Sequence, residues 1–360
     1  MQILPGSEFT HAVSWRSPSN IALVKYWGKY GNQYPQNPSL SFTLSQSCTE
    51  TKVAVRPRQS QVEKSQPISL NFLFHDHPNP SFAKKISAYL QTLLDDFPFL
   101  ANHHLEIRSS NSFPHSSGIA SSASGMSALA LCLCSLDKKM EGALSEADEV
   151  MFLQKASYYS RLGSGSACRS VFPQAAVWGN FSVLPASSQD YAIPYGQYLS
   201  PVFQNYCDAI LIISSSEKSV SSRAGHGLME QNPYALIRYK SAHQHLIALD
   251  QILQSSALDE FADIVELEAL ELHALMMCSN PSFILMKPGT LAVISEIRRF
   301  RQETKIPVCF TLDAGPNVHV LYPPSFKTQT EQFIQSELLK YCDDNYCIWD
   351  QAGDGPVQLL

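Results

Sequence analysis

The sequence predicts an α+β fold built as two lobes, and three observations lead to this prediction. The chain has 360 residues, more than a single hydrophobic core usually serves. Its first 75 residues contain short runs with β-type alternation, separated by Pro, Asn and Gly. Its second half alternates strand-like runs with long helical ones, which is typical of an α+β sandwich. We therefore expect one domain over residues 1–200 and another over residues 201–360.

Strands of the first half are expected where β-branched or alternating residues lie between turn residues. These runs are 12–16, 21–26, 40–45, 52–56, 68–74, 105–109, 175–178 and 182–184. Helical patterns cover residues 81–96, 147–159 and 118–135, the last being small and apolar throughout. The first half is therefore expected to be a sheet with helices packed against it.

The second half begins with a buried-type strand at residues 208–214, after a change of pattern near residues 199–206. Helices are expected over residues 233–254, 258–278 and 290–302. A hairpin of residues 308–312 and 318–322, a helix over 329–341 and a strand over 346–349 complete the pattern.

The composition limits the class of protein. The chain is 44% hydrophobic and 16% charged, which suits a packed core and not a disordered chain. Its net charge of -6 argues against nucleic acid as the main partner, because binding a phosphate backbone needs a basic surface. The nine cysteines include no CxxC pair, and neither a secretory signal nor a membrane-spanning apolar run is found. We expect a soluble cytoplasmic protein.

Two Gly/Ser segments are candidates for phosphate binding. Residues 114–125 (PHSSGIASSASG) follow an expected strand and run into an apolar helix, whose first backbone N–H groups would face an anion. Residues 161–170 (RLGSGSACRS) form an expected loop that ends in Arg169, whose planar fork suits a carboxylate or a phosphate. A flexible linker for the first segment and a surface arginine for the second are the alternative interpretations.

Further charged side chains lie in two other segments. Residues 20–29 (NIALVKYWGK) contain Lys25 and Lys29, and strand alternation would put Lys25 on the face opposite Tyr26. Asp313 is the lone acid of residues 313–317 (DAGPN). A surface strand with solvated lysines and an ordinary β-turn are the alternatives. The histidines show no metal-binding spacing such as HxxxH, so a metal held by protein side chains alone is not expected.

Six segments together resemble the diphosphomevalonate decarboxylase family, a branch of the GHMP kinase superfamily. In chain order they are SPSNIALVKYWGK, NPSLSFTLSQS, NSFPHSSGIASSASG, RLGSGSACRS, KSVSSRAGH and FTLDAGPNV. The resemblance extends from about Ser14 to Tyr322, and KYWGK, GSGSACRS and DAGPN are specific to this branch. Composition and periodicity alone indicate no more than a two-domain enzyme for an acidic metabolite.

The resemblance implies both a fold and a reaction. The fold is two-lobed and GHMP kinase-like, with a ribosomal S5 domain 2-like N-terminal lobe, a ferredoxin-like C-terminal lobe and the active site in the cleft between them. The reaction is the ATP-dependent conversion of mevalonate 5-diphosphate to isopentenyl diphosphate, with release of ADP, phosphate and CO2. Mg2+ is the implied cofactor, and a homodimer is the expected assembly.

The resemblance also implies roles for individual residues. By position, Asp313 resembles the general base, Arg169 the clamp on the substrate carboxylate, and Lys25 the charge that organises both. The residues resembling the substrate-binding set are Tyr26, Lys29, Ser164, Gly165, Ser166 and Arg223. The residues resembling the ATP phosphate loop are Gly118, Ala120, Ser121, Ser122 and Ser124. The ligands of Mg2+ stay open.

Two departures from the family pattern and three rival functions remain. Residues 115–117 (HSS) stand where the family usually has Thr-Ala-Ala, and His226 stands where Met is common. The rivals are a kinase of a mevalonate derivative, a decarboxylase of the monophosphate, and a non-catalytic ligand-binding protein on the same scaffold. Retention of the acid, the lysine and the arginine favours a decarboxylase, and Lys29 and Arg223 favour the diphosphate.

Overall fold

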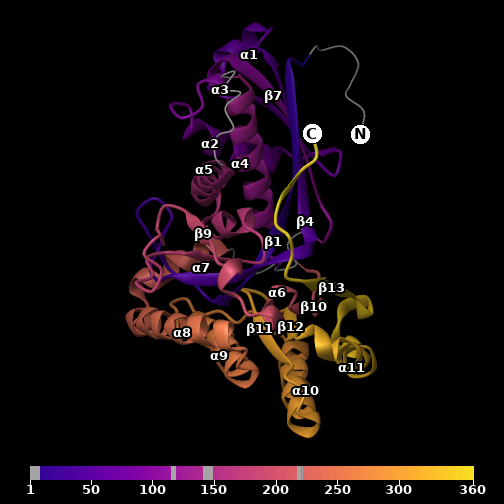
Figure 1. The fold of residues 1–360 in the computed structure, drawn as a ribbon. Helices are drawn as coiled ribbons and strands as arrows, with labels where there is room; N and C mark the ends of the chain where they lie inside the picture. Colours follow the sequence, from indigo (N-terminus) through magenta and orange to yellow (C-terminus); the bar gives the residue numbers. More distant parts are fainter. Residues whose placement is uncertain (1–8, 115–118, 141–148, 217–219, 221) are drawn as a thin grey trace.

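The computed structural model describes residues 9–114, 119–140, 149–216, 220 and 222–360, without the side chains of residues 222 and 223. Figure 1 shows two lobes, with the N-terminal half of the chain in the upper one and the C-terminal half in the lower one. An eight-stranded sheet belongs to the first lobe and a four-stranded sheet to the second. The expected two-lobed α+β arrangement is confirmed.

Two long strands organise the larger sheet. Strands β1 (His11–Val24) and β4 (Ser39–Pro57) run antiparallel, and each joins two of the short strands that were expected. A register shift between Pro18 and Asn20 lets β1 continue through the proline, as a bulge does. The remaining strands are β5 (Ser69–Phe74), β6 (His77–Pro78), β7 (His103–Asn111), β8 (Ala175–Trp178), β9 (Ala192–Pro194) and β14 (Val357–Gln358), and a separate ribbon pairs β2 (Lys29–Tyr30) with β3 (Tyr34–Pro35).

The strand expected over residues 182–184 is wrong. These residues turn instead, because the N–H of Leu184 donates to the carbonyl of Phe181 at 3.0 Å and Ser187 donates similarly to Leu184. Pro185 follows at once, so the chain could not donate from this position to a neighbouring strand. Strand β8 pairs with β4 and with β9, and the sequence pattern did not indicate β9.

Helices cover one face of the larger sheet (Figure 1). The central helix α4 (Ser121–Met140) packs against β1, β4 and α5 (Glu149–Gly163), and its many small residues allow close approach. The 3-10 helix η1 (Gly165–Val171) follows α5 directly and contacts α4 and β1. Shorter helices are α1 (Gln61–Ser65), α2 (Pro80–Gln91) and α3 (Phe99–Asn102); α2 ends before the expected residue 96.

The second lobe is a four-stranded antiparallel sheet with long helices. Its strand order is β11 (Cys309–Leu312), β12 (Val318–Tyr322), β10 (Cys207–Leu211) and β13 (Cys347–Gln351), which confirms the expected hairpin. The helices are α6 (Pro201–Gln204), α7 (Ser222–Gly227), α8 (Ala235–Ser255), α9 (Leu258–Met277), α10 (Pro288–Thr304) and α11 (Lys327–Phe333). A π-helical turn at Ile334–Leu338 continues α11, where a uniform helix was expected.

One hydrophobic core joins the two lobes. Phe42 of β4 and Tyr206 pack against Phe261 of α9, with ring centroids 6.3 and 5.2 Å from the Phe261 ring. The C-terminal strand β14 then pairs with β1 in the larger sheet. The domain boundary at residues 200 and 201 stays a prediction. No helix in the described part of the chain is long and apolar enough to cross a membrane.

Candidate active site

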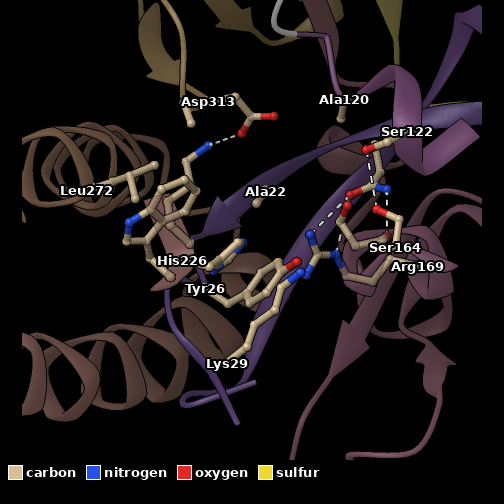
Figure 2. A pocket seen from close by; sticks show the side chains of 15 residues that line it. Ala22, Tyr26, Lys29, Ala120, Ser122, Ser164, Arg169, His226, Leu272 and Asp313 are labelled. Carbon is tan, nitrogen blue, oxygen red and sulfur yellow. Dashed lines mark hydrogen bonds and ion pairs between the residues drawn. The ribbon is translucent and has the colours of Figure 1, made fainter. Parts of the chain in front are cut away.

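A pocket between the lobes brings together most of the residues that the sequence singled out. It is lined by the end of β1, the start of α4, the η1 segment, α7, α9 and the loop after β11 (Figure 2). The expected site residues in its lining are Lys25, Tyr26, Lys29, Ala120, Ser122, Ser164, Ser166, Arg169 and Asp313. Residues as far apart in the sequence as Lys25 and Asp313 thus meet at a single site.

Lys25 and Asp313 form an ion pair in this pocket. The Lys25 Nζ lies 3.2 Å from Asp313 Oδ1, and the lysine side chain is only 2% exposed. Burial lowers the pKa of Lys25 below 10.5, an effect that Asp313 opposes. The interpretation of Lys25 as a solvated surface lysine is therefore wrong. The alternation argument also fails, because β1 ends at Val24 and both Lys25 and Tyr26 line the pocket.

Both members of this pair are positioned through their backbones. The N–H of Lys25 donates to Glu268 Oε2 of α9 at 2.8 Å, and its carbonyl accepts a 3.0 Å bond from Asn37. Asp313 follows β11, and its carbonyl lies 3.1 Å from His273 Nε2. The turn that begins at Asp313 thus places its carboxylate by local structure and by a contact from α9.

Arg169 lies in the 3-10 helix η1, where a loop was expected. It is buried, and its Nε and Nη2 donate to Asn20 Oδ1 at 3.4 and 3.2 Å, while Nη1 donates to Ser39 Oγ. Its guanidinium carbon lies 5.5 Å from the centroid of the Tyr26 ring. Fixed neighbours therefore hold the arginine in place.

Asn20 is a residue that the sequence argument missed. Besides accepting from Arg169, it donates to the carbonyl of Ser166 at 3.1 Å and to Ser170 Oγ at 2.7 Å. It also lines the pocket. It stands first in the motif NIALVKYWGK, and that position was the available signal.

Tyr26, Lys29 and His226 form one wall of the pocket (Figure 2). The Tyr26 ring stacks on the His226 ring at 5.0 Å, and Lys29 Nζ lies 5.9 Å from the Tyr26 centroid. Burial raises the pKa of the Tyr26 phenol above its ordinary value of 10.0, so the phenol keeps its proton. Burial, with Lys29 nearby, lowers the pKa of His226 well below 6.5. This wall therefore presents hydrogen-bond donors.

The two Gly/Ser segments meet on the opposite side of Figure 2. Ser122 Oγ of α4 lies 3.3 Å from Ser164 Oγ, and Ala120, just before α4, has a left-handed φ of 43°. Hydroxyls and the start of α4 thus face the pocket, as the anion-binding interpretation expects. The alternative interpretation of this segment as a flexible linker is wrong for the described residues, because Ser121 already begins a 20-residue helix.

Other predicted site residues lie behind the lining or outside the described part. Ser124 is fully buried and bonds Thr49 Oγ1 at 2.6 Å, and Ser121 is not among the lining residues. Gly165 is buried behind Tyr26, where an added Cβ would lie 2.7 Å from the phenol oxygen. Gly118 is outside the described residues. Arg223 lies in α7, but its side chain is not described.

One cluster of the described residues has the geometry of a metal site. It consists of His245, Glu268 and Glu271 on α8 and α9. Arg238 already pairs with Glu268 at 2.5 Å and with Glu271 at 3.1 Å. Because an arginine already pairs with both carboxylates, the cluster serves as a partly buried ion-pair network.

The two lobes, the hydroxyl-lined start of α4 and the Lys25–Asp313 pair define an enzyme of the GHMP kinase type. Residues 17–187 match the model of the diphosphomevalonate decarboxylase-like N-terminal domain. Residues 209–352 match that of the mevalonate 5-diphosphate decarboxylase C-terminal domain. The chain belongs to the diphosphomevalonate decarboxylase family.

Individual relatives agree with this assignment. Diphosphomevalonate decarboxylase of Ganoderma lucidum is 28% identical over 326 residues, which span 86% of this chain and 77% of the relative. The crystal structure of mevalonate diphosphate decarboxylase from Staphylococcus aureus is 26% identical and superimposes with a TM-score of 0.80 over 97% of this chain and 98% of that one. A structure of MDDEF in complex with MVAPP, AMPPCP and magnesium is 27% identical, with a TM-score of 0.79 and the same coverage.

Proposed function

We propose that this chain converts mevalonate 5-diphosphate and ATP to isopentenyl diphosphate, ADP, phosphate and CO2. The observation that carries the proposal is the ion pair of the buried Lys25 with Asp313, in one pocket with Arg169 and with the hydroxyls of Ser122 and Ser164. The family membership of both halves of the chain supports the same reaction.

The chemistry explains why an acid is needed in this pocket. A tertiary hydroxyl is a poor leaving group, so the γ-phosphoryl of ATP is first transferred to its oxygen. Asp313 accepts the hydroxyl proton in this step, as a general base. The C–O bond then breaks and phosphate leaves, and the bond to the carboxyl carbon breaks next. Its electron pair forms the alkene as CO2 departs.

The two buried cations suit this sequence of steps. Lys25 keeps Asp313 ionised before the proton transfer, because a nearby opposite charge favours the carboxylate. Arg169 binds the substrate carboxylate and orients the carbon–carbon bond that breaks. Fixed charges that need no rearrangement stabilise developing charge more effectively than solvent does.

Other residues in and near the pocket are assigned to the phosphate groups. The set assigned to the substrate diphosphate is Tyr26, Lys29, Ser164, Gly165, Ser166 and Arg223, and the set assigned to the ATP phosphates is Gly118, Ala120, Ser121, Ser122 and Ser124. Mg2+ prefers oxygen ligands and is usually shared between one or two protein groups and the phosphates of the substrate. The Asp313 carboxylate and the Ser122 hydroxyl are oxygen donors of this kind, and Mg2+ would neutralise charge on the transferred phosphoryl group.

A coupled assay tests the function directly. Release of ADP and of 14CO2 is measured with mevalonate, its 5-phosphate and its 5-diphosphate, each with ATP and Mg2+. We expect both products, in equal amounts, from the 5-diphosphate alone. Release of ADP without CO2 would instead identify a kinase. Equal amounts of both products from the 5-phosphate would identify a decarboxylase of the monophosphate. Binding of a substrate without release of either product would identify a ligand-binding protein.

The variant Asp313→Asn tests the order of the steps. It keeps shape and volume but cannot accept the proton, and loss of a general base typically lowers the rate about 10²- to 10⁴-fold. ADP and CO2 release should fall together, with the affinity for ATP and substrate changed less than about threefold. ADP release at the normal rate without CO2 would place Asp313 after phosphoryl transfer.

Assembly and location are further proposals. A homodimer is the default for oligomers of this size, and sedimentation at several concentrations tests it. Cytoplasmic location fits the nine cysteines, none of which is disulfide-bonded. The division at residues 200 and 201 is tested by limited proteolysis.

A further inference from the structure

His226 is held against the pocket by two aromatic neighbours. Its ring stacks on Tyr26 with a centroid distance of 5.0 Å and lies 4.3 Å from the Trp27 ring. Gly225 lets α7 approach this closely, since an added Cβ there would lie 2.5 Å from the Trp27 ring. His226 is 92% buried by this packing, yet it lines the pocket. The imidazole is therefore a rigid part of the wall.

The hydrogen bonding of the ring fixes its tautomer. The backbone N–H of Gly28 donates to His226 Nδ1 at 2.9 Å. A ring nitrogen that accepts cannot carry a proton, so the proton of the neutral ring is on Nε2. Gly28 has a φ of +112°, a conformation that places its N–H in a turn and that other residues rarely adopt. The turn after β1 thus sets the ring to donate from Nε2.

The surroundings of this donor indicate an anion. Lys29 and Tyr26 share its wall, and Arg169 lies on the far side of the Tyr26 ring. Lys29 and Arg169 are cations, so neither can accept a hydrogen bond from a ring N–H. A phosphate oxygen accepts from all of them, and a neutral donor adds a bond without adding charge.

We propose that His226 is a substrate-binding residue whose Nε2–H donates to the diphosphate group. This inference rests on the proposed function for the identity of the substrate, and it extends the substrate-binding set to a residue on α7. The stack on Tyr26 and the Gly28 bond make the donor preorganised, so little entropy is lost when the anion binds.

Two substitutions separate the two roles of the His226 ring, which are donation from Nε2–H and acceptance of the Gly28 N–H by Nδ1. In His226→Asn the side-chain oxygen can replace Nδ1 as acceptor for Gly28, and the Nε2 donor is lost. In His226→Gln the longer amide carries an N–H to the position of Nε2. Loss of a hydrogen bond to a charged group weakens binding about 10- to 100-fold. We expect this loss in the Asn variant and a change below about threefold in the Gln variant.

Binding is measured by calorimetry with inorganic diphosphate at saturating ADP, which fills the nucleotide site. The KM values for mevalonate 5-diphosphate and ATP are measured alongside, and thermal unfolding reports on folding. The inference predicts weaker diphosphate binding and a raised KM for the substrate in the Asn variant, with the KM for ATP unchanged.

Several results would overturn this assignment. These are wild-type affinity in the Asn variant, an equal loss in both variants, or a parallel rise in the KM for ATP, which would indicate a structural role. The proposed function fails separately. If wild-type protein bound inorganic diphosphate through His226 but released no CO2 from the substrate, the anion site would stand and the reaction would be wrong.

Discussion

At the scale of single residues, Lys25 shows how burial and pairing oppose each other. Burial disfavours its charge, and the Asp313 and Glu268 carboxylates favour it, while Arg169 adds repulsion. Burial is the largest of these effects, so the pKa of Lys25 is lowered. The charge that keeps Asp313 ready as a base is therefore more sensitive to pH than that of a solvated lysine.

This balance predicts the alkaline limit of activity. Below its folded pKa Lys25 is protonated and pairs with Asp313, and above that pKa the pair is lost. Since the pKa is lowered from 10.5, kcat should fall at a pH below 10.5. In Lys25→Arg the charge persists to higher pH, so the fall in kcat should move to higher pH, even if the maximum kcat is lower. The measurement is kcat between pH 6 and 10.5 for the wild-type protein and for the variant. If kcat fell at the same pH in both proteins, the alkaline limit would not be set by Lys25.

The geometry around Arg169 predicts that a substitution there lowers turnover while the chain still folds. Its fork is held by Asn20 and Ser39, and a lysine cannot reproduce that planar geometry. Arg169→Lys should lower kcat about 10- to 100-fold, the effect of losing one charged hydrogen bond. Arg298→Lys, on an exposed part of α10, is the matched control and should be neutral. Near-normal turnover in the Arg169 variant, with circular dichroism confirming the fold, would indicate no contact with substrate.

At the scale of elements, α9 supports the end of β1. Glu268 is fully buried and accepts from the Lys25 backbone, from Arg238 at 2.5 Å and from His245 at 2.5 Å. Each carboxylate oxygen therefore has a partner, which is what a buried charge requires. The ion-pair network of α8 and α9 thereby fixes the backbone from which the Lys25 side chain extends.

Glu268→Gln tests this support. The amide is similar in shape but leaves Arg238 with only the partly exposed Glu271 as its counter-charge. Breaking a buried pair completely costs about 3–5 kcal/mol, so the loss here should be smaller than that. We expect a lower melting temperature and, because Lys25 is displaced, a kcat reduced about tenfold with little change in the KM for ATP. Glu271→Gln, whose partly exposed carboxylate does not contact Lys25, is the control and should leave kcat unchanged. Loss of stability with full kcat would limit Glu268 to a structural role.

At the scale of the whole molecule, contacts between the lobes keep the pocket assembled. Asp350 of β13 accepts from the backbone N–H groups of Ser45, Gln46 and Ser47 in β4, each at 2.8 Å. The shared hydrophobic core lies beside this contact. Residues of the pocket come from both lobes, so their distances depend on these contacts.

Asp350→Asn is predicted to loosen the connection between the lobes. An amide oxygen can accept fewer and weaker bonds, so at least one buried N–H is left unsatisfied, at a cost of about 1–3 kcal/mol. The melting temperature should fall by several degrees in calorimetry. Glu303→Gln, an exposed surface ion pair, is the control and should change it little. An unchanged melting temperature in the Asp350 variant would show that this contact contributes nothing to stability.

Much of the fold could be predicted because its signals are local. The hairpin around residues 313–317, β8 and the long helices α8 and α9 follow from periodicity and turn residues over short windows. The continuous β1 could not be predicted in this way, because its pairing with β4 overrides the break suggested by Pro18. The π-helical turn after α11 likewise has no local signal.

The sequence by itself determined the α+β class, the family resemblance and the residue types available for the reaction. The tertiary structure decided what state those residues are in. Lys25 and Asp313 are 288 positions apart, and Gly28 and His226 are 198 apart. No local pattern could therefore show that the first two form an ion pair or that the bond between the other two fixes a tautomer. Charge and proton position depend on burial and on neighbours in space, and these exist only once the two lobes have packed together.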